Sequence, residues 1–494
     1  MSEMSETLLT CEQILQATGA AFVSGGGELC ITAVQTDSRQ VEEGSLFVPL
    51  LGEKQDGHKF IPEALSKGAT AVLLCMENFE QEGQLYSKLF AQHPAVHFFA
   101  VENTLKALQQ LAACYVEKFP RLIKVGITGS SGKTTTKEIL VSMLSQKYRV
   151  VSNEGNLNSE TGLPLSVFKI RSDHECGVFE LGMNRAGEIG ETAGVLKPRF
   201  AILTNISSAH VGMMGSVENI AREKVKIFSH FGGFGTAVIP QECPFDEIIR
   251  NEIEGKVVTF GEGNPVKLIK DDGLKGQRVA IDGEECYLHL AGRHNLLNAS
   301  AAACMAKVLG LKADQIARGI EAVRPLHGRC QVRDVGEFVL IDDCYNANPD
   351  SMQKALEFLS SIECNGAAKI CVLADMLELG ERSDAEHSKI GQLAAHCGAS
   401  LLIFVGSLVK AAYDASQGSS AKRVFIEGSG DDAMEAVSRE VTAFASAFAS
   451  SFASSFASQN AQEGAKPVVL LKGSRGMHLE RVASLLEGSG REAE

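Results

Sequence analysis

The segment GITGSSGKTTTKEIL, residues 126–140, has the composition of a loop that binds phosphate. A glycine-rich turn between a strand and a helix points successive backbone N–H groups at one anion, and the helix N-terminus adds its positive dipole end. We expect Lys133 to reach the outer phosphates of a nucleotide and the Thr134 hydroxyl to bind Mg²⁺. The predicted nucleotide-binding residues of this loop are Gly129, Ser130, Ser131, Gly132, Lys133, Thr134 and Thr135.

The loop departs from the usual pattern at one position, because Ile127 stands where that pattern has glycine. Gly126 and Gly129 shift the flexible positions, but Gly132-Lys133-Thr134 retains the groups that supply charge and bind metal. A glycine-rich turn that binds nothing gives no reason for a lysine directly after the last glycine. The sequence therefore predicts a nucleotide site.

Three further side chains with possible metal chemistry follow this loop. Glu180 and His210 each come after an apolar strand-like run, in FELGMN and TNISSAHVG, and Lys224 lies in the helical run IAREKVKIF. Ligands of open α/β sheets bind at the carboxyl ends of strands, where an acidic residue is a natural Mg²⁺ ligand. Taken alone, His210 is more often an ordinary loop residue and Lys224 a solvated helix residue. Their order along the chain, after the phosphate loop and Glu180, favours a role in the same site.

Composition limits the class of protein. The formal net charge of −14 argues against broad binding to nucleic acid or to anionic membranes. The 13 cysteines are scattered without a Cys-x-x-Cys pair, which fits reduced thiols better than disulfides or structural zinc. The acidic N-terminus shows no signal peptide and no segment is long and apolar enough to span a bilayer, so we expect a cytoplasmic protein.

The elements that must position these residues fall into three blocks, at 1–100, 101–324 and 325–494. A linking helix is predicted at 103–119, because Asn103 is a suitable cap and apolar residues recur at helical spacing. The second and third blocks alternate apolar strand-like runs with helical segments, which favours mostly parallel sheets covered by helices on both faces. The predicted fold class is α/β.

Residues 443–458 stand apart, because phenylalanine recurs every four residues among Ala and Ser. The phenylalanines continue the spacing of Val437 and Val441, which predicts a long amphipathic helix. The alternative is a low-complexity expansion whose distal aromatic side chains seek a partner surface. Neither interpretation gives this stretch a catalytic role.

The order of these motifs resembles that of the Mur ligase family, the ATP-dependent amide-forming enzymes of peptidoglycan synthesis. The shared pattern is G-x-T-G-x-x-G-K-T-T, a glutamate after a strand, T-N-x-x-x-x-H and a lysine in the next helix, and it continues through AGRHNLLNASAAA at 291–303. In the third block, DDCYNANPDSM (342–352), VLADMLELG (372–380) and LKGSRGMHLE (471–480) resemble the members that join D-alanyl-D-alanine to a UDP-MurNAc-tripeptide. The resemblance covers nearly the whole chain.

The resemblance implies three domains: a UDP-substrate-binding domain at 1–100, a central P-loop ATPase-type domain at 101–324 and a C-terminal Rossmann-like domain at 325–494. It implies two Mg²⁺ ions held by Thr134, Glu180, His210 and Lys224, the last after carbamylation. It gives catalytic roles to Lys133, His210 and Lys224. The further nucleotide-binding positions that it implies are Asn295, Asn298, Arg329 and Asp343. The implied substrate-binding positions are Ser38, Arg39, Asn158, Tyr345, Asn346 and Asn348.

The activity implied by the resemblance is amide-bond formation through an acyl phosphate. ATP would phosphorylate the terminal carboxylate of UDP-MurNAc-tripeptide, and the amine of D-alanyl-D-alanine would then attack it. The implied cofactors are ATP and Mg²⁺, and we expect a monomer. The third residue of the tripeptide stays open. Alternatives are a ligase that adds that third residue, whose D-N-P-R run has no counterpart here, folylpolyglutamate synthase, a P-loop switch and a small-metabolite kinase.

Overall fold

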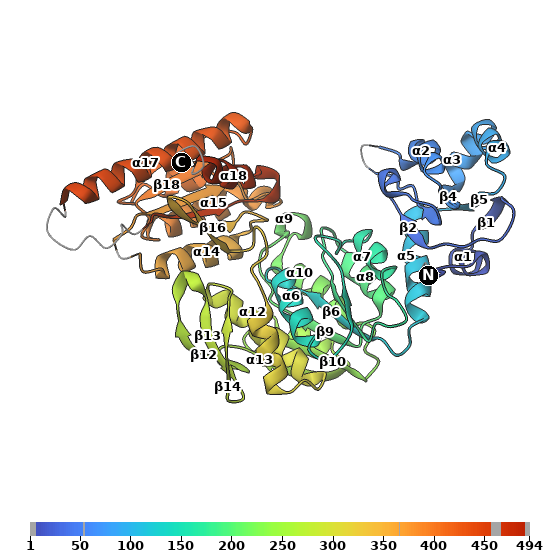
Figure 1. The fold of residues 1–494 in the computed structure, drawn as a ribbon, viewed down its shortest axis with the longest axis horizontal. Coiled ribbons are helices and arrows are strands. Elements are labelled where there is room, and N and C mark those ends of the chain that lie inside the picture. The colour runs from blue at the N-terminus through green and yellow to red at the C-terminus, as the bar shows by residue number, and fades with distance from the viewer. Residues whose placement is uncertain (1–5, 53–54, 365, 456–465, 490–494) are drawn as a thin grey trace.

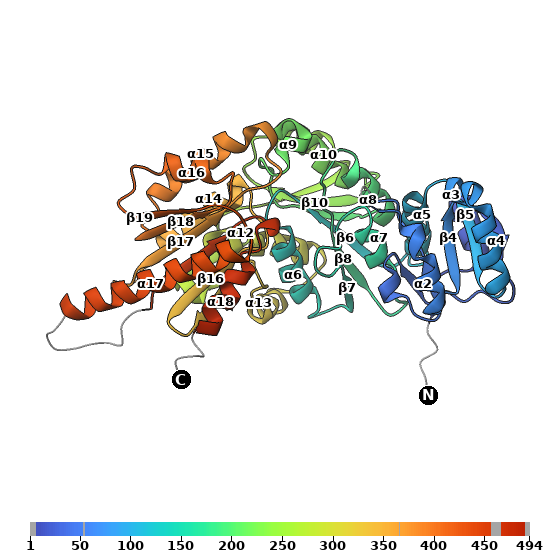
Figure 2. The same cartoon turned by 90° about the horizontal axis from the view of Figure 1, so that it is seen from above.

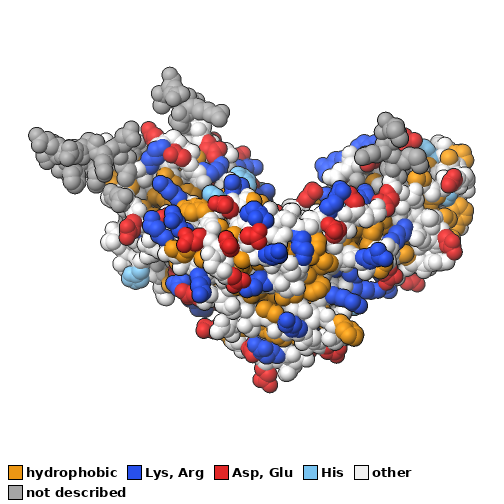
Figure 3. All heavy atoms as spheres, turned by 60° about the horizontal axis from the view of Figure 1, so that its bottom comes forward, with side chains coloured by type: hydrophobic (Ala, Val, Ile, Leu, Met, Phe, Trp, Pro, Cys, Tyr) orange, Lys and Arg blue, Asp and Glu red, His pale blue; other side chains and the backbone are white. Residues whose placement is uncertain are grey.

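The computed structural model describes residues 6–52, 55–364, 366–455 and 466–489. Three lobes follow one another along the chain, each built on its own main sheet (Figure 1). The two outer lobes flank the central one and leave a hollow between them (Figure 3). In the described part of the chain, no helix is both long and apolar enough to cross a membrane.

The first lobe contains a five-stranded sheet in the order β1-β5-β4-β3-β2. Its strands are β1 (Ala21–Ser24), β2 (Ala33–Gln35), β3 (Ser45–Phe47), β4 (Ala71–Cys75) and β5 (His97–Val101). Only β1 is antiparallel to its neighbour. The helices are α1 (Cys11–Thr18), α2 (Ile61–Ser66), α3 (Met76–Gln81) and α4 (Gly83–Gln92). One face of the sheet packs against α1 and α5, and the other packs against α2 and α4.

Helix α5 (Thr104–Glu117) connects the first lobe to the second. The Asn103 side chain accepts a hydrogen bond from Lys106 N, so the predicted cap is confirmed. Buried apolar residues on α5 contact both lobes, because Leu108 and Leu111 belong to a core that also contains residues of α1 and α8. The helix is therefore a packed connection.

The central lobe contains a six-stranded parallel sheet in the order β11-β10-β9-β6-β8-β7. The strands are β6 (Ile123–Thr128), β7 (Val150–Ser152), β8 (Cys176–Glu180), β9 (Phe200–Leu203), β10 (Gly235–Pro240) and β11 (Gly255–Phe260). The helices are α6 (Lys133–Leu144), α7 (Gly162–Val167), α8 (Glu188–Leu196), α9 (Val211–Met214), α10 (Val217–Lys224), α11 (Asp246–Asn251), α12 (Arg293–Val308) and α13 (Ala313–Ala322).

Alternate residues of the central strands enter two different cores. Ile202 and Val238 pack against α6, α12 and α13, whereas Ala201 and Ala237 pack against α5 and α8. Burial on both faces explains why these strands are continuous apolar runs in the sequence. The predicted α/β class is confirmed.

A three-stranded antiparallel sheet beside the central lobe was not predicted. It consists of β12 (Val266–Asp271), β13 (Gln277–Ile281) and β14 (Glu284–Leu288). Asp282 and Gly283 both have positive φ in the two-residue turn between β13 and β14. An Asp-Gly pair between two short runs is a strong hairpin signal, so the sequence did contain the information.

The third lobe contains a six-stranded sheet in the order β15-β16-β20-β17-β18-β19, in which only β15 is antiparallel. The strands are β15 (Gln331–Val335), β16 (Phe338–Asp343), β17 (Lys369–Ala374), β18 (Leu401–Val405), β19 (Lys422–Ile426) and β20 (Val468–Lys472). Helices α14 (Pro349–Ser361), α15 (Ser383–Ala395) and α16 (Lys410–Ala415) cover one face. Helices α17 (Asp431–Ser455) and α18 (Glu480–Ser489) cover the other (Figure 2).

The phenylalanine-rich stretch continues α17 through residue 455. Val437 and Val441 are buried against the third sheet, and Phe444 packs partly against the same core. The rings of Phe444 and Phe448 stack with centroids 6.3 Å apart. The predicted amphipathic helix is confirmed to this point, and the side chains of Phe452 and Phe456 lie outside what the structure describes.

Candidate active site

The phosphate loop connects β6 to α6, at the carboxyl edge of the central sheet. Gly129 and Gly132 have φ of 153° and 77°. A Cβ at Gly129 would lie 1.8 Å from Thr204 Oγ1, and one at Gly132 would lie 2.4 Å from Asn298 Oδ1. A side chain at either position would displace the facing Thr204 or Asn298 side chain, and Gly132 also requires glycine for its backbone angle.

Asn205 organises the loop from the end of β9. Its Oδ1 accepts hydrogen bonds from Ser130 N at 3.1 Å and from Ser131 N at 2.9 Å. Its Nδ2 donates to Ser131 Oγ at 2.7 Å. The Thr204 hydroxyl donates to Ser131 O at 2.7 Å. Two adjacent N–H groups thus converge on a single oxygen atom, which is the geometry of an anion-binding loop.

Thr134 and Glu180 form a cluster of oxygen atoms next to the loop. The Thr134 hydroxyl donates to Glu180 Oε2 at 2.8 Å, and Asn158 Nδ2 donates to Glu180 Oε1 at 2.7 Å. Arg329 Nη2, from the third lobe, donates to Thr134 Oγ1 at 3.1 Å. A hydroxyl and a carboxylate are hard oxygen ligands that suit Mg²⁺, which takes its remaining ligands from phosphates and water. The donor set therefore fits one magnesium ion.

Lys133 and Lys224 converge from different helices on Gly129 O, each with Nζ 3.0 Å from that carbonyl oxygen. Lys224 is only 1% exposed. Burial, reinforced by the neighbouring Lys133 charge, holds the pKa of Lys224 well below its usual range. Burial also lowers the pKa of Lys133, although the Glu180 carboxylate opposes this shift. The Lys133 and Lys224 amines thus share one corner of the site, and the low pKa of Lys224 favours its neutral form beside the Lys133 charge.

His210 connects the central lobe to the third lobe. Its Nδ1 lies 2.8 Å from Glu378 Oε2, an ion-pair distance, but it has no partner in hydrogen-bonding geometry. His210 lowers the pKa of the Glu378 carboxyl. A Cβ at Gly212 would lie 2.7 Å from Glu378 O, so the two lobes pack tightly here. Across the described residues, no group of three or more His, Cys, Asp or Glu side chains could hold a metal ion.

The third lobe contributes a group of aromatic and charged side chains. The Arg329 guanidinium lies 3.9 Å from the Tyr345 ring centroid, and that of Arg475 lies 5.5 Å from it. Asp343 Oδ1 accepts from Cys330 N at 3.1 Å, and Asp343 Oδ2 pairs with the buried Lys472 Nζ at 2.7 Å. Asn346 and Asn348 bond locally, to Ala347 N and to Ser351 N respectively.

Helix α12 contributes a further wall of the site. Asn295 and Asn298 lie one turn apart, and Asn298 Nδ2 donates to Asn295 Oδ1 at 3.1 Å. Asn295 Nδ2 in turn donates to Ala291 O at 2.8 Å. The neighbouring His294 lies close to Asp343, Lys354 and Lys472, and burial lowers its pKa from 6.5 to about 4. The imidazole is therefore neutral at physiological pH.

A cavity of about 1030 Å³ between the central and third lobes brings most of the predicted residues together. The predicted residues that line it are Ser130, Ser131, Gly132, Lys133, Thr134, Thr135, Asn158, Glu180, His210, Asn295, Asn298, Arg329, Asp343, Tyr345, Asn346 and Asn348. Gly129 and Lys224 lie behind the loop, joined to the lining Lys133 through Gly129 O.

Ser38 and Arg39 are not brought to this cavity, because they lie in the first lobe. The Ser38 hydroxyl donates to Glu63 Oε2 at 2.7 Å. Arg39 forms an ion pair with Asp37 at 2.7 Å, with 80% of its side chain exposed, and it lowers the pKa of Asp37 to about 2. A role for either residue in binding the UDP group stays a prediction.

Several polar residues around the cavity were not predicted. All but Lys354 lie inside a motif that was recognised, and Lys354 lies two residues after one. These residues are Asn205 in TNISSAH, Asp350 in DDCYNANPDSM and Lys354 just after it, Glu378 in VLADMLELG, and Lys472 and Arg475 in LKGSRGMHLE. The motif was the available signal; which of its side chains face the cavity depends on how the lobes pack.

Comparison with known proteins defines the class. Three family descriptions match: "Mur ligase family, catalytic domain" at 30–115, "Mur ligase middle domain" at 127–306 and "Mur ligase, glutamate ligase domain" at 328–475. The chain belongs to the Mur ligase family, as its motifs predict.

Several similar proteins are one member of that family. UDP-N-acetylmuramoyl-tripeptide–D-alanyl-D-alanine ligase of Treponema pallidum is 40% identical over 484 residues, which are 97% of this chain and 99% of that protein. A crystal structure of MurF from Acinetobacter baumannii has a TM-score of 0.80 and 30% identity, covering 98% of this chain and 100% of that one. MurF ligase from Thermotoga maritima, in complex with ADP, has a TM-score of 0.74 and 27% identity over 94% and 98% of the two chains.

Proposed function

We propose that this protein joins D-alanyl-D-alanine to the carboxyl terminus of a UDP-MurNAc-tripeptide at the expense of ATP, in the synthesis of peptidoglycan precursors. One observation carries the proposal: the phosphate loop and the charged side chains of the third lobe face each other across one cavity. The chain that forms this cavity is similar along its whole length to a UDP-N-acetylmuramoyl-tripeptide–D-alanyl-D-alanine ligase. Because a carboxylate is a poor electrophile, the reaction needs a phosphoryl transfer before the amide bond can form.

The phosphate loop is the proposed site of the ATP phosphates. The N–H groups of Ser130 and Ser131 already converge on one oxygen atom, and Lys133 stands at the start of α6 beside them. Phosphoryl transfer depends on in-line placement and on neutralising charge more than on covalent help from the protein. We propose that Arg329, stacked on Tyr345, and Asp343 hold the nucleotide from the third lobe, while Asn295 and Asn298 lie beside it.

Thr134 and Glu180 are the residues that would hold one Mg²⁺ ion, with phosphate oxygens completing its shell. A bound ion supplies charge neutralisation at the transferred phosphoryl group. We propose His210 and Lys224 for a second ion. Lys224 can act as a ligand only after its amine is converted to a carbamate, and burial supports this because its lowered pKa increases the fraction of free amine.

The acyl phosphate formed on the tripeptide must be protected from water until the dipeptide amine attacks it. Placement between two lobes that already touch through Thr134 and Arg329 supports such protection. We propose that Asn158, Tyr345, Asn346 and Asn348 orient the two peptide substrates in the cavity. Ser38 and Arg39 would bind the UDP group by exchanging their present partners for its diphosphate.

The proposed setting is the cytoplasm, where ATP and UDP-sugar precursors are available. The proposed active unit is a single chain. In the cytoplasm, ATP, the UDP-MurNAc-tripeptide and D-alanyl-D-alanine would reach the cavity by diffusion.

The test is to supply the purified protein with ATP, Mg²⁺, UDP-MurNAc-tripeptide and D-alanyl-D-alanine, and to measure ADP and the pentapeptide product. We expect both products to form together and to require the dipeptide. ADP release that ignores the dipeptide would favour a kinase or a switch. Replacement Lys133→Ala should reduce turnover by about 10²- to 10³-fold if Lys133 acts like other preorganised donors; near-normal turnover would contradict its assignment.

A further inference from the structure

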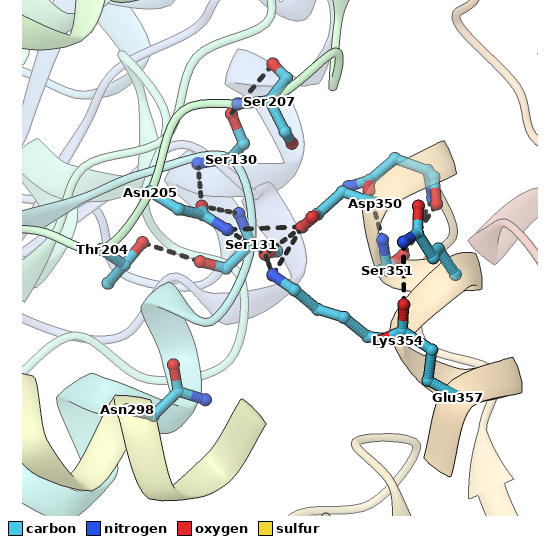
Figure 4. Close-up of polar contacts among 12 residues, drawn as sticks. Ser130, Ser131, Thr204, Asn205, Ser207, Asn298, Asp350, Ser351, Lys354 and Glu357 are labelled. Atoms are coloured by element: carbon cyan, nitrogen blue, oxygen red, sulfur yellow. Dashed lines mark hydrogen bonds and ion pairs between the residues drawn. The ribbon is translucent and has the colours of Figure 1, made fainter. Parts of the chain in front are cut away.

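Asp350, in the first turn of α14, reaches from the third lobe to the phosphate loop of the central lobe (Figure 4). Its Oδ2 accepts hydrogen bonds from the Ser131 hydroxyl at 2.8 Å, from Lys354 Nζ at 2.8 Å and from Asn205 Nδ2 at 3.3 Å. Lys354 Nζ also lies 3.4 Å from Ser131 Oγ. The contact thus joins two lobes through one carboxylate.

Three donors that converge on one anionic oxygen define a site for an oxyanion. A hydroxyl, an amide and an ammonium surround Asp350 Oδ2, and any phosphate oxygen at that point would accept the same three hydrogen bonds. Lys354 lines the cavity and is 31% exposed, so an entering ligand can reach it. Asp350 Oδ2 therefore marks a point that binds negative charge, held by three residues that line the cavity: Ser131, Asn205 and Lys354.

The donors to Asp350 belong to the loop proposed for the triphosphate. Asn205 bonds Ser130 N and Ser131 N through its other amide atom, so it is part of the same set of groups. A carboxylate and a phosphate group that accept hydrogen bonds from the same donors, Ser131 and Asn205, repel each other. They compete for this corner of the cavity.

We propose that Lys354 is a further phosphate-binding residue and that Asp350 competes with the nucleotide for it. A triphosphate on the loop replaces the Asp350 carboxylate on Ser131 and Asn205, and the Lys354 ammonium then pairs with the outermost phosphate. ADP lacks that phosphate and therefore leaves the Asp350–Lys354 pair intact. The inference rests on the proposed function, because it needs ATP in the cavity, and it adds two residues that discriminate ATP from ADP.

The simpler interpretation is that Asp350 and Lys354 only stabilise α14, as ion pairs four residues apart commonly do. Helix α13 offers a matched control for that interpretation. Asp314 is likewise the second residue of its helix, and it accepts from Arg318 Nη1 at 2.9 Å, four residues further along. That pair lies outside the cavity, so it shares the local helix effect without the phosphate contact.

The experiment measures binding of ADP and of a β,γ-methylene ATP analogue to the full-length protein by calorimetry in Mg²⁺ buffer. Lys354→Met should raise the Kd of the analogue roughly 10-fold and change the Kd of ADP less than about 2-fold. Asp350→Asn should lower the Kd of the analogue roughly 3- to 10-fold, because it removes a competing charge. Asp314→Asn should change neither constant, and Lys354→Arg should retain most of the affinity for the analogue.

Equal losses of analogue and ADP affinity in Lys354→Met would overturn the inference, because they indicate a structural role. No change in either ligand, or weaker analogue binding by Asp350→Asn, would overturn it as well. If the wild-type protein is folded but binds neither nucleotide, the proposed function fails. If the wild-type protein binds both and forms product while Lys354→Met behaves normally, only the present inference fails.

Discussion

Replacing Glu180 by glutamine separates its proposed metal role from its structural role. Glu180 Oε2 accepts from Thr134 and Oε1 from Asn158. In Glu180→Gln, the amide oxygen can still accept from Asn158, and the amide nitrogen can donate to the Thr134 hydroxyl, which accepts as well as donates. Both hydrogen bonds survive, so we expect the free energy of unfolding to change by less than about 1 kcal/mol.

Activity should respond very differently to the same substitution. Glutamine keeps the shape of Glu180 but removes the negative charge proposed to bind Mg²⁺ beside Thr134. A loss of one preorganised electrostatic group corresponds to about 3–4 kcal/mol of transition-state stabilisation, or about 10²- to 10³-fold in kcat. The Mg²⁺ concentration needed for half-maximal rate should rise in the same variant.

The assay follows ADP release with all three substrates at several Mg²⁺ concentrations, alongside chemical denaturation. Glu175→Gln is the control, because Glu175 directly precedes β8, at the end opposite Glu180, and accepts from Arg149 N. It should leave the Mg²⁺ dependence unchanged. Near-normal kcat with an unaltered Mg²⁺ dependence in Glu180→Gln would refute the metal assignment, and a large loss of stability would refute the hydrogen-bond argument.

Two further predictions concern the walls of the cavity. Gly132→Ala should lower the free energy of unfolding by about 2–3 kcal/mol and weaken nucleotide binding, because its φ is 77° and its Cβ would lie 2.4 Å from Asn298 Oδ1. Gly155 also has positive φ, but a Cβ there would meet open space, so Gly155→Ala should lower the free energy of unfolding by only about 1 kcal/mol in chemical denaturation. An equal loss of stability in both variants would contradict the proposed clash at Gly132. Stability should fall by about 2 kcal/mol as pH decreases from 6.5 to 4, because the unfolded His294 takes up a proton in that range whereas the folded ring, with pKa about 4, does not. His294→Gln should remove this part of the pH dependence, and an unchanged denaturation profile would contradict it.

The main strands could be predicted because their signal is local. Runs such as KICVLA at β17 are apolar and buried at every position after the first lysine, since a central parallel strand is covered on both faces. Strands β12 and β13 were missed because one side of that small sheet is open to solvent: only Val266 of β12 is buried, and the apolar run is lost. The edge strands β1 and β15 are short or partly polar for the same reason. The antiparallel direction of β15 follows from the two-residue turn that joins it to β16.

The residues of the candidate site also divide into those that have a local sequence signal and those that do not. Gly129 to Thr134 are consecutive, so their spacing alone predicts an anion-binding turn followed by a lysine and a hydroxyl. Glu180 lies 46 residues beyond Thr134, and it could be predicted only through its place at the end of a strand in the same sheet. Asp350 lies inside a recognised motif and Lys354 just after it, but neither side chain had a signal of its own, because a charged pair at i and i+4 on a helix is most often a solvated face.

The sequence by itself determined the phosphate loop, the continuous core strands and the helix caps, because each depends on residues within about one or two turns of each other. Only the tertiary structure decided which side chains of the third lobe meet that loop. Ser131 and Asp350 are 219 positions apart, and Thr134 and Arg329 are 195 apart, so their contacts depend on how two lobes with separate sheets pack together. Local periodicity carries no information about that packing.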